Sequence, residues 1–217
     1  MARKLCAEFI GALLLAACVI GSGIMAERMA GGNAAVALLA NTLATVAVIA
    51  ALISSLGPIS GAHFNPVVTI AAIGLRRLDP ALGAAYVITQ MAGCCAGAML
   101  ANAMFELPLV NLSTHARHGP AQWLSELVAT AGLVLIAFRS PDIREAAWRV
   151  ALWIGAAYWF TASTSFANPA ISIGRALSDS FAGIRPVDVP GFIAAQLAGA
   201  VLGVVLLRAL GEPKVAT

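Results

Sequence analysis

The sequence predicts an all-α membrane protein in which six membrane-spanning helices and two half-length helices form an inverted repeat of three plus three spans. Three observations predict this fold: long apolar runs, two Asn-Pro dipeptides 103 positions apart (65 to 168), and other residues that recur in the same order in both halves. Of the 217 residues, 60% are hydrophobic and only 11% are charged, against roughly 25% charged residues in soluble domains. We therefore expect residues 1–217 to form a single membrane domain.

Six apolar runs are each close to the roughly 20 residues that a helix needs to cross the hydrocarbon core of a bilayer. The first run follows two basic residues, as a signal peptide would, but it is too long for a signal-peptide core and contains Glu8. We therefore expect it to be a span. The expected spans are residues 5–25, 34–53, 81–101, 123–138, 150–166 and 189–207.

The basic residues predict an orientation with both termini in the cytoplasm. Nine of them then face the cytoplasm and four face outside, which is the bias of the positive-inside rule. No basic cluster is dense enough to predict nucleic-acid binding. The four outside are Arg28, Arg117, Arg175 and Arg185, and the nine inside are Arg3, Lys4, Arg76, Arg77, Arg139, Arg144, Arg149, Arg208 and Lys214.

All four cysteines lie in apolar runs, and we expect them to be small packing residues rather than a disulfide framework. The adjacent pair Cys94 and Cys95 does not readily offer the ligand geometry of a soft metal. The sequence therefore predicts no metal site. The other two cysteines are Cys6 and Cys18.

Polar residues inside the spans show the internal repeat. Glu8 opens the first span of the first half and Glu126 that of the second, while Gln90 and Gln196 are each followed three residues later by glycine. Each half holds three spans, an odd number, so two halves with the same fold must cross the membrane in opposite senses. We expect a first repeat over residues 1–105, a second over 121–211, and a functional site where they meet.

Each Asn-Pro pair begins a segment that is too short to cross the membrane, residues 66–75 in the first half and 169–177 in the second. Asparagine can cap the free N–H groups of a helix start, and proline at the first helical position lacks the N–H that would stay unpaired. About ten residues give a helix of roughly 15 Å, half the hydrocarbon thickness. We expect two inverted half-helices that meet at the midplane.

The segments before these half-helices, residues 60–64 and 163–167, predict a pore. Irregular backbone at membrane depth is tolerated only where it is buried in protein or lines water. The converging helix N-termini would place partial positive charge at one point. We expect the pore centre to be formed by Asn65, Pro66, Asn168 and Pro169.

The sequence SGAHFNPVVTI at residues 60–70 and FANPA at 166–170, with the repeated Glu and Gln positions, resemble the aquaporin or major intrinsic protein family. The resemblance covers the whole chain, and two such NPA-type boxes in an inverted repeat are far more specific than one. It implies a passive transmembrane channel that is not an enzyme and needs no cofactor. It also implies a homotetramer in the lipid bilayer, with small neutral solutes as its other partners.

By this resemblance, the amides of Asn65 and Asn168 donate hydrogen bonds to a permeating solute, and His63 lines the pore near its cytoplasmic side. Glu8 and Glu126 would accept hydrogen bonds from the backbone of the two loops, as a scaffold. Gln90 and Gln196 would support them. In a coupled transporter the two glutamates would instead be proton or cation sites, since charge inside a membrane is costly unless it is paired.

The selectivity filter departs from the family pattern. Most members have an arginine directly after the second box, whereas this chain has Ile171. The family spacing places Thr45, Ala156 and Ser165 at the other filter positions. All three are small, so the resemblance implies a filter that is wider and less polar than that of a strict water channel.

Arg175 lies four residues after Ile171 and therefore on the same face of the half-helix, one turn further out. We expect it to reach the outer interface or to pair with Asp179, its own i+4 neighbour. The alternative is an outer-pore position in which its guanidinium partly replaces the missing charge.

The chain resembles a bacterial branch of the family in which the aliphatic replacement goes with metalloid handling. We therefore expect a channel of the bacterial inner membrane for water, glycerol-like polyols and neutral metalloid hydroxides such as arsenous acid. Three alternatives stay open: a water-selective channel in which Arg175 replaces the filter arginine, a proton-coupled secondary transporter, and a non-conducting junction protein of the same fold.

Overall fold

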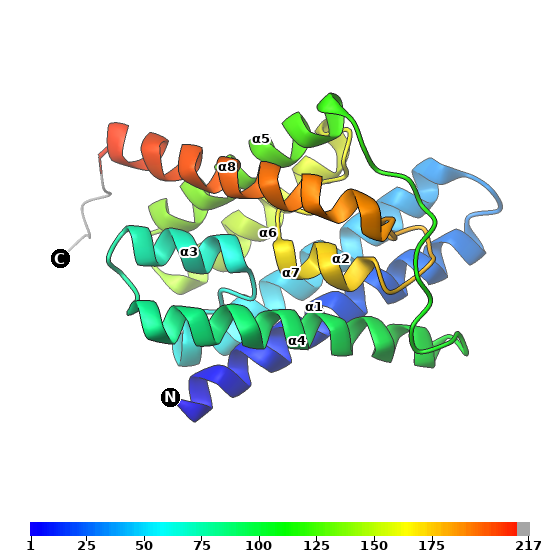
Figure 1. Cartoon of the computed structure of the whole chain (residues 1–217), viewed down its shortest axis with the longest axis horizontal. Helices are drawn as coiled ribbons and strands as arrows, with labels where there is room; N and C mark the ends of the chain where they lie inside the picture. Colours follow the sequence, from blue (N-terminus) through cyan, green and yellow to red (C-terminus); the bar gives the residue numbers. More distant parts are fainter. Residues whose placement is uncertain (212–217) are drawn as a thin grey trace.

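The computed structural model describes residues 1–211, and Lys214 lies outside them. The described chain is helical, with six long helices surrounding two short ones, α3 and α7, which lie in line and meet near the centre (Figure 1). The predicted all-α fold with two half-helices is confirmed. The elements are α1 (Ala2–Met29), α2 (Ala34–Ser60), α3 (Pro66–Gly74), α4 (Pro80–Met104), α5 (Pro120–Arg139), α6 (Ile143–Phe160), α7 (Pro169–Arg175), the 3-10 turn η1 (Pro186–Asp188) and α8 (Val189–Ala209).

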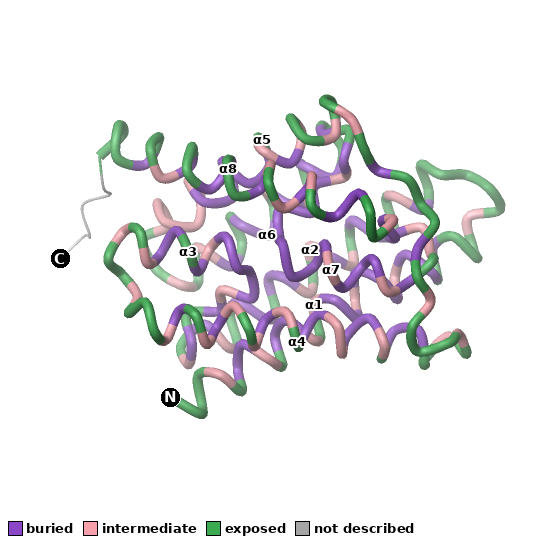
Figure 2. Tube along the Cα trace, in the orientation of Figure 1, coloured by how far each residue is buried: buried purple, intermediate pink, exposed green. Residues whose placement is uncertain are grey.

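Five of the described helices are long and apolar enough to cross a membrane: α1, α2, α4, α5 and the continuous segment Pro186–Ala209. Large apolar side chains are exposed on the outside of the bundle, among them Leu43 (62%), Ile88 (66%) and Val201 (66%). Buried positions face inward, and the central half-helices are mostly buried (Figure 2). The bundle therefore has the apolar exterior that a bilayer requires.

The fifth span differs from the prediction of residues 150–166. Helix α6 begins at Ile143, because the side chain of Asp142 caps it by accepting hydrogen bonds from two backbone N–H groups at 2.8 and 2.9 Å. It ends at Phe160, since Thr164, Ser165 and Ala167 have φ of 58°, 50° and 47°, which no α-helix admits. The predicted span was therefore placed about two turns too far along the chain.

Glycines bring the helices of each repeat close together, as small residues do in membrane bundles. A Cβ added to Gly97 of α4 would clash with the carbonyl oxygen of Leu13 in α1. At the matching place in the second repeat, a Cβ on Gly203 of α8 would lie 2.7 Å from the carbonyl oxygen of Ala131 in α5. The same close packing is thus built once in each half.

Replacing Gly203 by alanine is expected to destabilise the protein by about 1–3 kcal/mol, because the methyl group meets backbone that cannot move aside. A lower midpoint of thermal unfolding in detergent would show this. Gly74→Ala is the control, since nothing lies within 4 Å of a Cβ at that position. Equal midpoints for the two variants would contradict the prediction.

We call the end of the bundle that carries segments 105–119 and 176–188 the loop face. The two segments run side by side there: Asn111 N–H donates to the carbonyl of Leu177 (3.0 Å) and Ser113 N–H to that of Ala176 (3.0 Å). In Figure 1 the long green connection between α4 and α5 crosses over the loop that follows α7. The loop face therefore covers the C-terminal end of this half-helix.

Candidate functional site

The loops that precede the two half-helices have the same unusual backbone. Ala62 and Phe64 have φ of 50° and 47°, and Ser165 and Ala167, 103 positions later (62 to 165, 64 to 167), have φ of 50° and 47°. Non-glycine residues rarely adopt this left-handed conformation, and it persists only where surrounding contacts enforce it. The two loops therefore share strained residues at equivalent positions, as an inverted repeat requires.

Glu8 holds the first loop. One carboxylate oxygen accepts hydrogen bonds from the Ser60 hydroxyl (2.6 Å) and the His63 N–H (3.0 Å), and the other from the Phe64 N–H (2.8 Å) and the Gln90 amide (2.7 Å). The side chain of Glu8 is fully buried. Four donors fill the acceptor sites that a carboxylate offers.

Glu126 holds the second loop in the same way. It accepts from the Ser163 hydroxyl (2.6 Å), the Phe166 N–H (2.8 Å), the Ala167 N–H (2.8 Å) and the Gln196 amide (2.6 Å). Neither glutamate is among the described residues that border the cavity between the loops. Both therefore have the surroundings of a scaffold rather than of a proton carrier exposed to solutes.

The two asparagines cap their own half-helices and also join them. The Oδ1 of each accepts from the backbone N–H two residues further on, at 3.0 Å for Asn65 and 2.9 Å for Asn168. The amide nitrogen of Asn65 donates to the carbonyl of Ala167 (2.8 Å), and that of Asn168 donates to the carbonyl of Phe64 (2.9 Å). One hydrogen of each amide remains without a protein acceptor in the described chain, and both asparagines border the cavity.

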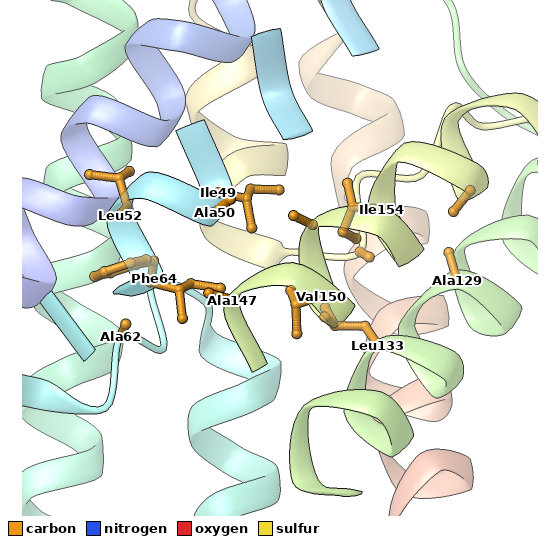
Figure 3. Packing of buried hydrophobic residues seen from close by; sticks show 14 of the residues in the cluster. Ile49, Ala50, Leu52, Ala62, Phe64, Ala129, Leu133, Ala147, Val150 and Ile154 are labelled. Atoms are coloured by element: carbon orange, nitrogen blue, oxygen red, sulfur yellow. The ribbon is translucent and has the colours of Figure 1, made fainter. Parts of the chain in front are cut away.

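A cavity of about 170 Å³ passes between these loops. One wall is apolar, formed by side chains of α2 and α6 that Figure 3 labels among the packed hydrophobic residues, with Phe64 at one side of this cluster. The polar positions lie on and beside the two loops. Cavity-lining residues include Ile49, Leu52, Val150 and Ile154 on the apolar side and Thr45, His63, Asn65, Ser165, Asn168 and Arg175 on the polar side.

Of the four predicted filter residues, Thr45, Ser165 and Ile171 border the cavity, but Ala156 does not. Ala156 is exposed on the opposite face of α6, because successive helical residues turn by about 100° and the cavity face carries positions 154 and 158. Its place is taken by Tyr158, whose hydroxyl lies 3.3 Å from the Thr45 hydroxyl. The Thr45 hydroxyl already donates to the carbonyl of Asn41 (2.8 Å), so Tyr158 is the donor of that pair.

Arg175 takes neither of the positions that we expected first. Its side chain is buried and borders the cavity, with Nε donating to the carbonyl of Ala182 and Cζ 3.4 Å from the centroid of the Phe166 ring. Asp179 is instead occupied by Thr114, whose N–H donates to its carboxylate (2.8 Å). The loop after α7 folds back over the half-helix and so keeps Arg175 inside.

His63 borders the cavity in the half away from the loop face, with Nδ1 3.0 Å from the Thr69 hydroxyl. Phe166 is its counterpart by register (63 + 103 = 166), and this relation is a signal that the sequence itself contains. Nothing in the sequence pointed to Arg117 or Tyr158. Burial lowers the pKa of Arg117 to about 10, which leaves the guanidinium charged at neutral pH.

Known proteins with a similar sequence or a similar fold belong to one family, and this agrees with the arrangement described above. The family model described as "Major intrinsic protein" matches residues 1–155. Aquaglyceroporin AqpS of Rhizobium meliloti (strain 1021) is 51% identical over 215 residues, covering 98% of this chain and 92% of that protein. Human Aquaporin-2 is 32% identical over 149 residues, 66% of this chain and 53% of its own. The crystal structure of the aquaglyceroporin from Plasmodium falciparum superimposes with a TM-score of 0.68 at 21% identity, covering 94% of this chain and 93% of that one.

Proposed function

Since this chain belongs to the major intrinsic protein family, and is therefore an integral membrane channel for small solutes rather than an enzyme, we propose that it conducts uncharged solutes larger than water. The proposed solutes are glycerol-like polyols and neutral metalloid hydroxides such as arsenous acid, with water passing as well. An aquaglyceroporin as a 51% identical relative supports the polyols. Transport would follow the solute gradient, without a cofactor.

One observation carries this proposal: the residue after the second box is Ile171, and it borders the same cavity as the small polar residues Thr45 and Ser165. An aliphatic side chain there leaves room for a carbon or metalloid skeleton, while Thr45 and Ser165 offer hydroxyls to its polar side. Channel selectivity depends on pore width and on the donors and acceptors that line it. A wall that is apolar on one side and polar on the other suits a small polyhydroxy solute.

Arg175 would act at the loop-face end of this filter. Its guanidinium lies over the ring of Phe166 and borders the cavity, so it would donate to a solute from the cavity wall. Its positive charge, together with the N-termini of both half-helices, would oppose cations. The filter that we propose therefore lacks arginine at position 171 but takes a guanidinium from the next helical turn.

We propose that Asn65 and Asn168, fixed by Pro66 and Pro169, donate their free amide hydrogens to solutes at the pore centre. His63 would line the pore on the cytoplasmic side. Glu8 and Glu126, with Gln90 and Gln196, would hold the loops. The proton-coupled alternative is disfavoured because every acceptor site of both glutamates is occupied by protein donors.

We further propose a homotetramer in a bacterial inner membrane, with both termini in the cytoplasm and the loop face outside. The bacterial relative and the basic residues of the sequence support this placement. The protein would be a single channel domain built from repeats over residues 1–105 and 121–211. Exposed apolar residues such as Trp148 (64%) and Leu152 (62%) on α6 offer surface for lipid or a neighbouring copy.

Ile171→Arg is expected to lower glycerol and arsenous acid permeability at least about tenfold, roughly 1.4 kcal/mol of barrier, because a second guanidinium would fill the filter. Water permeability should fall much less. The measurement is light scattering of reconstituted vesicles under gradients of each solute, with Ile171→Val as the control that keeps an aliphatic wall. A wild-type protein that passes water alone would favour the water-selective alternative, and an Ile171→Arg variant with unchanged glycerol flux would contradict our filter.

A further inference from the structure

Arg117 lies in the connection between α4 and α5, which has no counterpart in the internal repeat, and yet its side chain is 7% exposed. Its Nε donates to the carbonyl of Gly183 (2.8 Å), and its two terminal nitrogens donate to the carbonyls of Ser163 (3.3 Å) and Phe181 (3.3 Å). Asp188 accepts from its backbone N–H (2.8 Å) and fixes the chain at this point. A buried guanidinium with three carbonyl acceptors joins the second pore loop to the loop face.

The two buried arginines divide three consecutive carbonyls between them. Arg117 binds those of Phe181 and Gly183, and Arg175 binds that of Ala182. Both guanidinium groups also lie against Phe166, with Cζ at 5.2 Å from the ring centroid for Arg117 and 3.4 Å for Arg175. The position of Arg175 in the cavity therefore depends on a segment that Arg117 holds.

In the first repeat, a different residue donates to the carbonyl of the pore loop. There, the buried Tyr86 donates its hydroxyl to the carbonyl of Ser60 (2.9 Å) and stands edge-on to His63, with ring centroids 5.6 Å apart and planes at 77°. In the second repeat, the matching ring is Phe192 (86 + 106 = 192, as 90 + 106 = 196 for the glutamines). It stands edge-on to Phe166 at 5.0 Å and 70°, but it has no hydroxyl.

The carbonyl that the missing hydroxyl would bind is that of Ser163, the counterpart of Ser60 (60 + 103 = 163). Arg117 supplies this donor instead. Because a buried carbonyl without a donor is destabilising, the second loop needs such a partner. In the second repeat this donor therefore comes from the loop face and not from the helix that matches α4. At the loop face, Arg117 can also hold the segment 181–183.

We propose that Arg117 is the positioning residue of the filter: it replaces the hydroxyl that Tyr86 provides in the first repeat and, through segment 181–183, keeps the guanidinium of Arg175 against Phe166. The proposal rests on the proposed function in one respect, namely that the filter faces uncharged solutes. It makes solute discrimination a property of the connection between the repeats as well as of the half-helices.

Removal of Arg117 would loosen both the second loop and the anchor of Arg175. One lost positioning hydrogen bond corresponds to a factor of about 2 to 10. We expect Arg117→Leu to raise the permeability of a four-carbon polyol relative to glycerol by about threefold or more, because the filter wall is no longer held. In the double variant Arg117→Leu, Phe192→Tyr, the new hydroxyl should bind the Ser163 carbonyl and bring the ratio part of the way back, because the bonds to Phe181 and Gly183 remain lost.

The measurement is the ratio of erythritol to glycerol permeability in reconstituted vesicles, with Arg28→Leu as the control. Arg28 also donates to a loop carbonyl, that of Phe105 (3.2 Å), and lies over an aromatic ring, but it borders neither pore loop. An unchanged ratio in Arg117→Leu would overturn the proposal, and so would a double variant whose ratio equals that of Arg117→Leu. Glycerol flux through the wild-type protein tests the proposed function separately in the same vesicles.

Hydrogen exchange gives a second readout and remains informative if Arg117→Leu does not assemble. In the milder variant Arg117→Lys, which keeps the charge but cannot reach three carbonyls, the amides of residues 163–167 should exchange faster. Those of the matching loop, residues 60–64, should not change, and they serve as an internal control within the same molecule. If the amides of residues 163–167 exchanged at the same rate in the wild type and in Arg117→Lys, the proposal would be overturned.

Discussion

Glu126→Gln is expected to abolish conduction and to lower the free energy of unfolding by about 2–5 kcal/mol. An amide presents one acceptor oxygen and one donor nitrogen, whereas the carboxylate accepts four hydrogen bonds from the second loop, Ser163 and Gln196. The Ser163 hydroxyl and the Gln196 amide can reorient, but the N–H groups of Phe166 and Ala167 cannot both find an acceptor. The left-handed residues of the loop would then lose the contact that holds them.

The test combines thermal unfolding in detergent with water flux in vesicles. Glu8→Gln should behave like Glu126→Gln, because its carboxylate accepts the same set of donors in the first repeat. Glu145→Gln is the control, since its carboxylate forms an exposed ion pair with Arg149 (2.9 Å, side chains 52% and 48% exposed), and such pairs contribute at most about 1 kcal/mol. A Glu126→Gln protein with wild-type stability and flux would contradict the scaffold role.

Arg175→Ala is expected to let cations through and to raise the upper size limit for solutes. A unit charge about 4–8 Å from the path of a cation opposes it by roughly 2–4 kcal/mol at an effective dielectric constant of 20. Its loss corresponds to an increase in cation leak of about 30- to 1,000-fold. The substitution also removes a side chain from the cavity wall beside Phe166, and the added space should favour larger polyols.

Proton and potassium flux into vesicles under a membrane potential measures the first effect, and polyol permeability the second. Arg28→Ala is the matched control, because Arg28 also lies in the last turn of a helix at the loop face but is exposed. If Arg175→Ala kept both its cation exclusion and its size limit, Arg175 would be a structural residue and the filter would end at Ile171.

The fold could be predicted almost completely because the membrane restricts it severely. Apolar runs must be helices, and a short run that begins with Asn-Pro must be a half-helix in the interior. The paired residues Asn65 and Asn168 and their supporting glutamates recur at matching places, so their meeting in space follows from the symmetry of the repeat. The predicted span at residues 150–166 failed because it left out the polar first turns of α6, which begin after the Asp142 cap, and continued into the second pore loop.

The filter was predictable only in part. Thr45, Ser165 and Ile171 lie where spacing placed them, but counting along the chain to Ala156 missed the cavity face of α6, which carries Tyr158 instead. The family spacing, counted back from the second box across a loop, selects the wrong face of α6 if the helix ends at a different residue. Each residue along a helix turns the side-chain direction by about 100°. For a residue that must face a pore, an error of two positions is enough.

The sequence by itself determined that this protein is a six-span channel with two inverted half-helices and one polar centre, because periodicity, caps and an internal repeat are local properties of the chain. Only the tertiary structure decided what surrounds that centre. Arg175 stays inside because the loop after α7 folds back over it, and Arg117 reaches the second pore loop from a connection without a counterpart in the repeat. Such contacts join segments distant along the chain, and no local pattern encodes them.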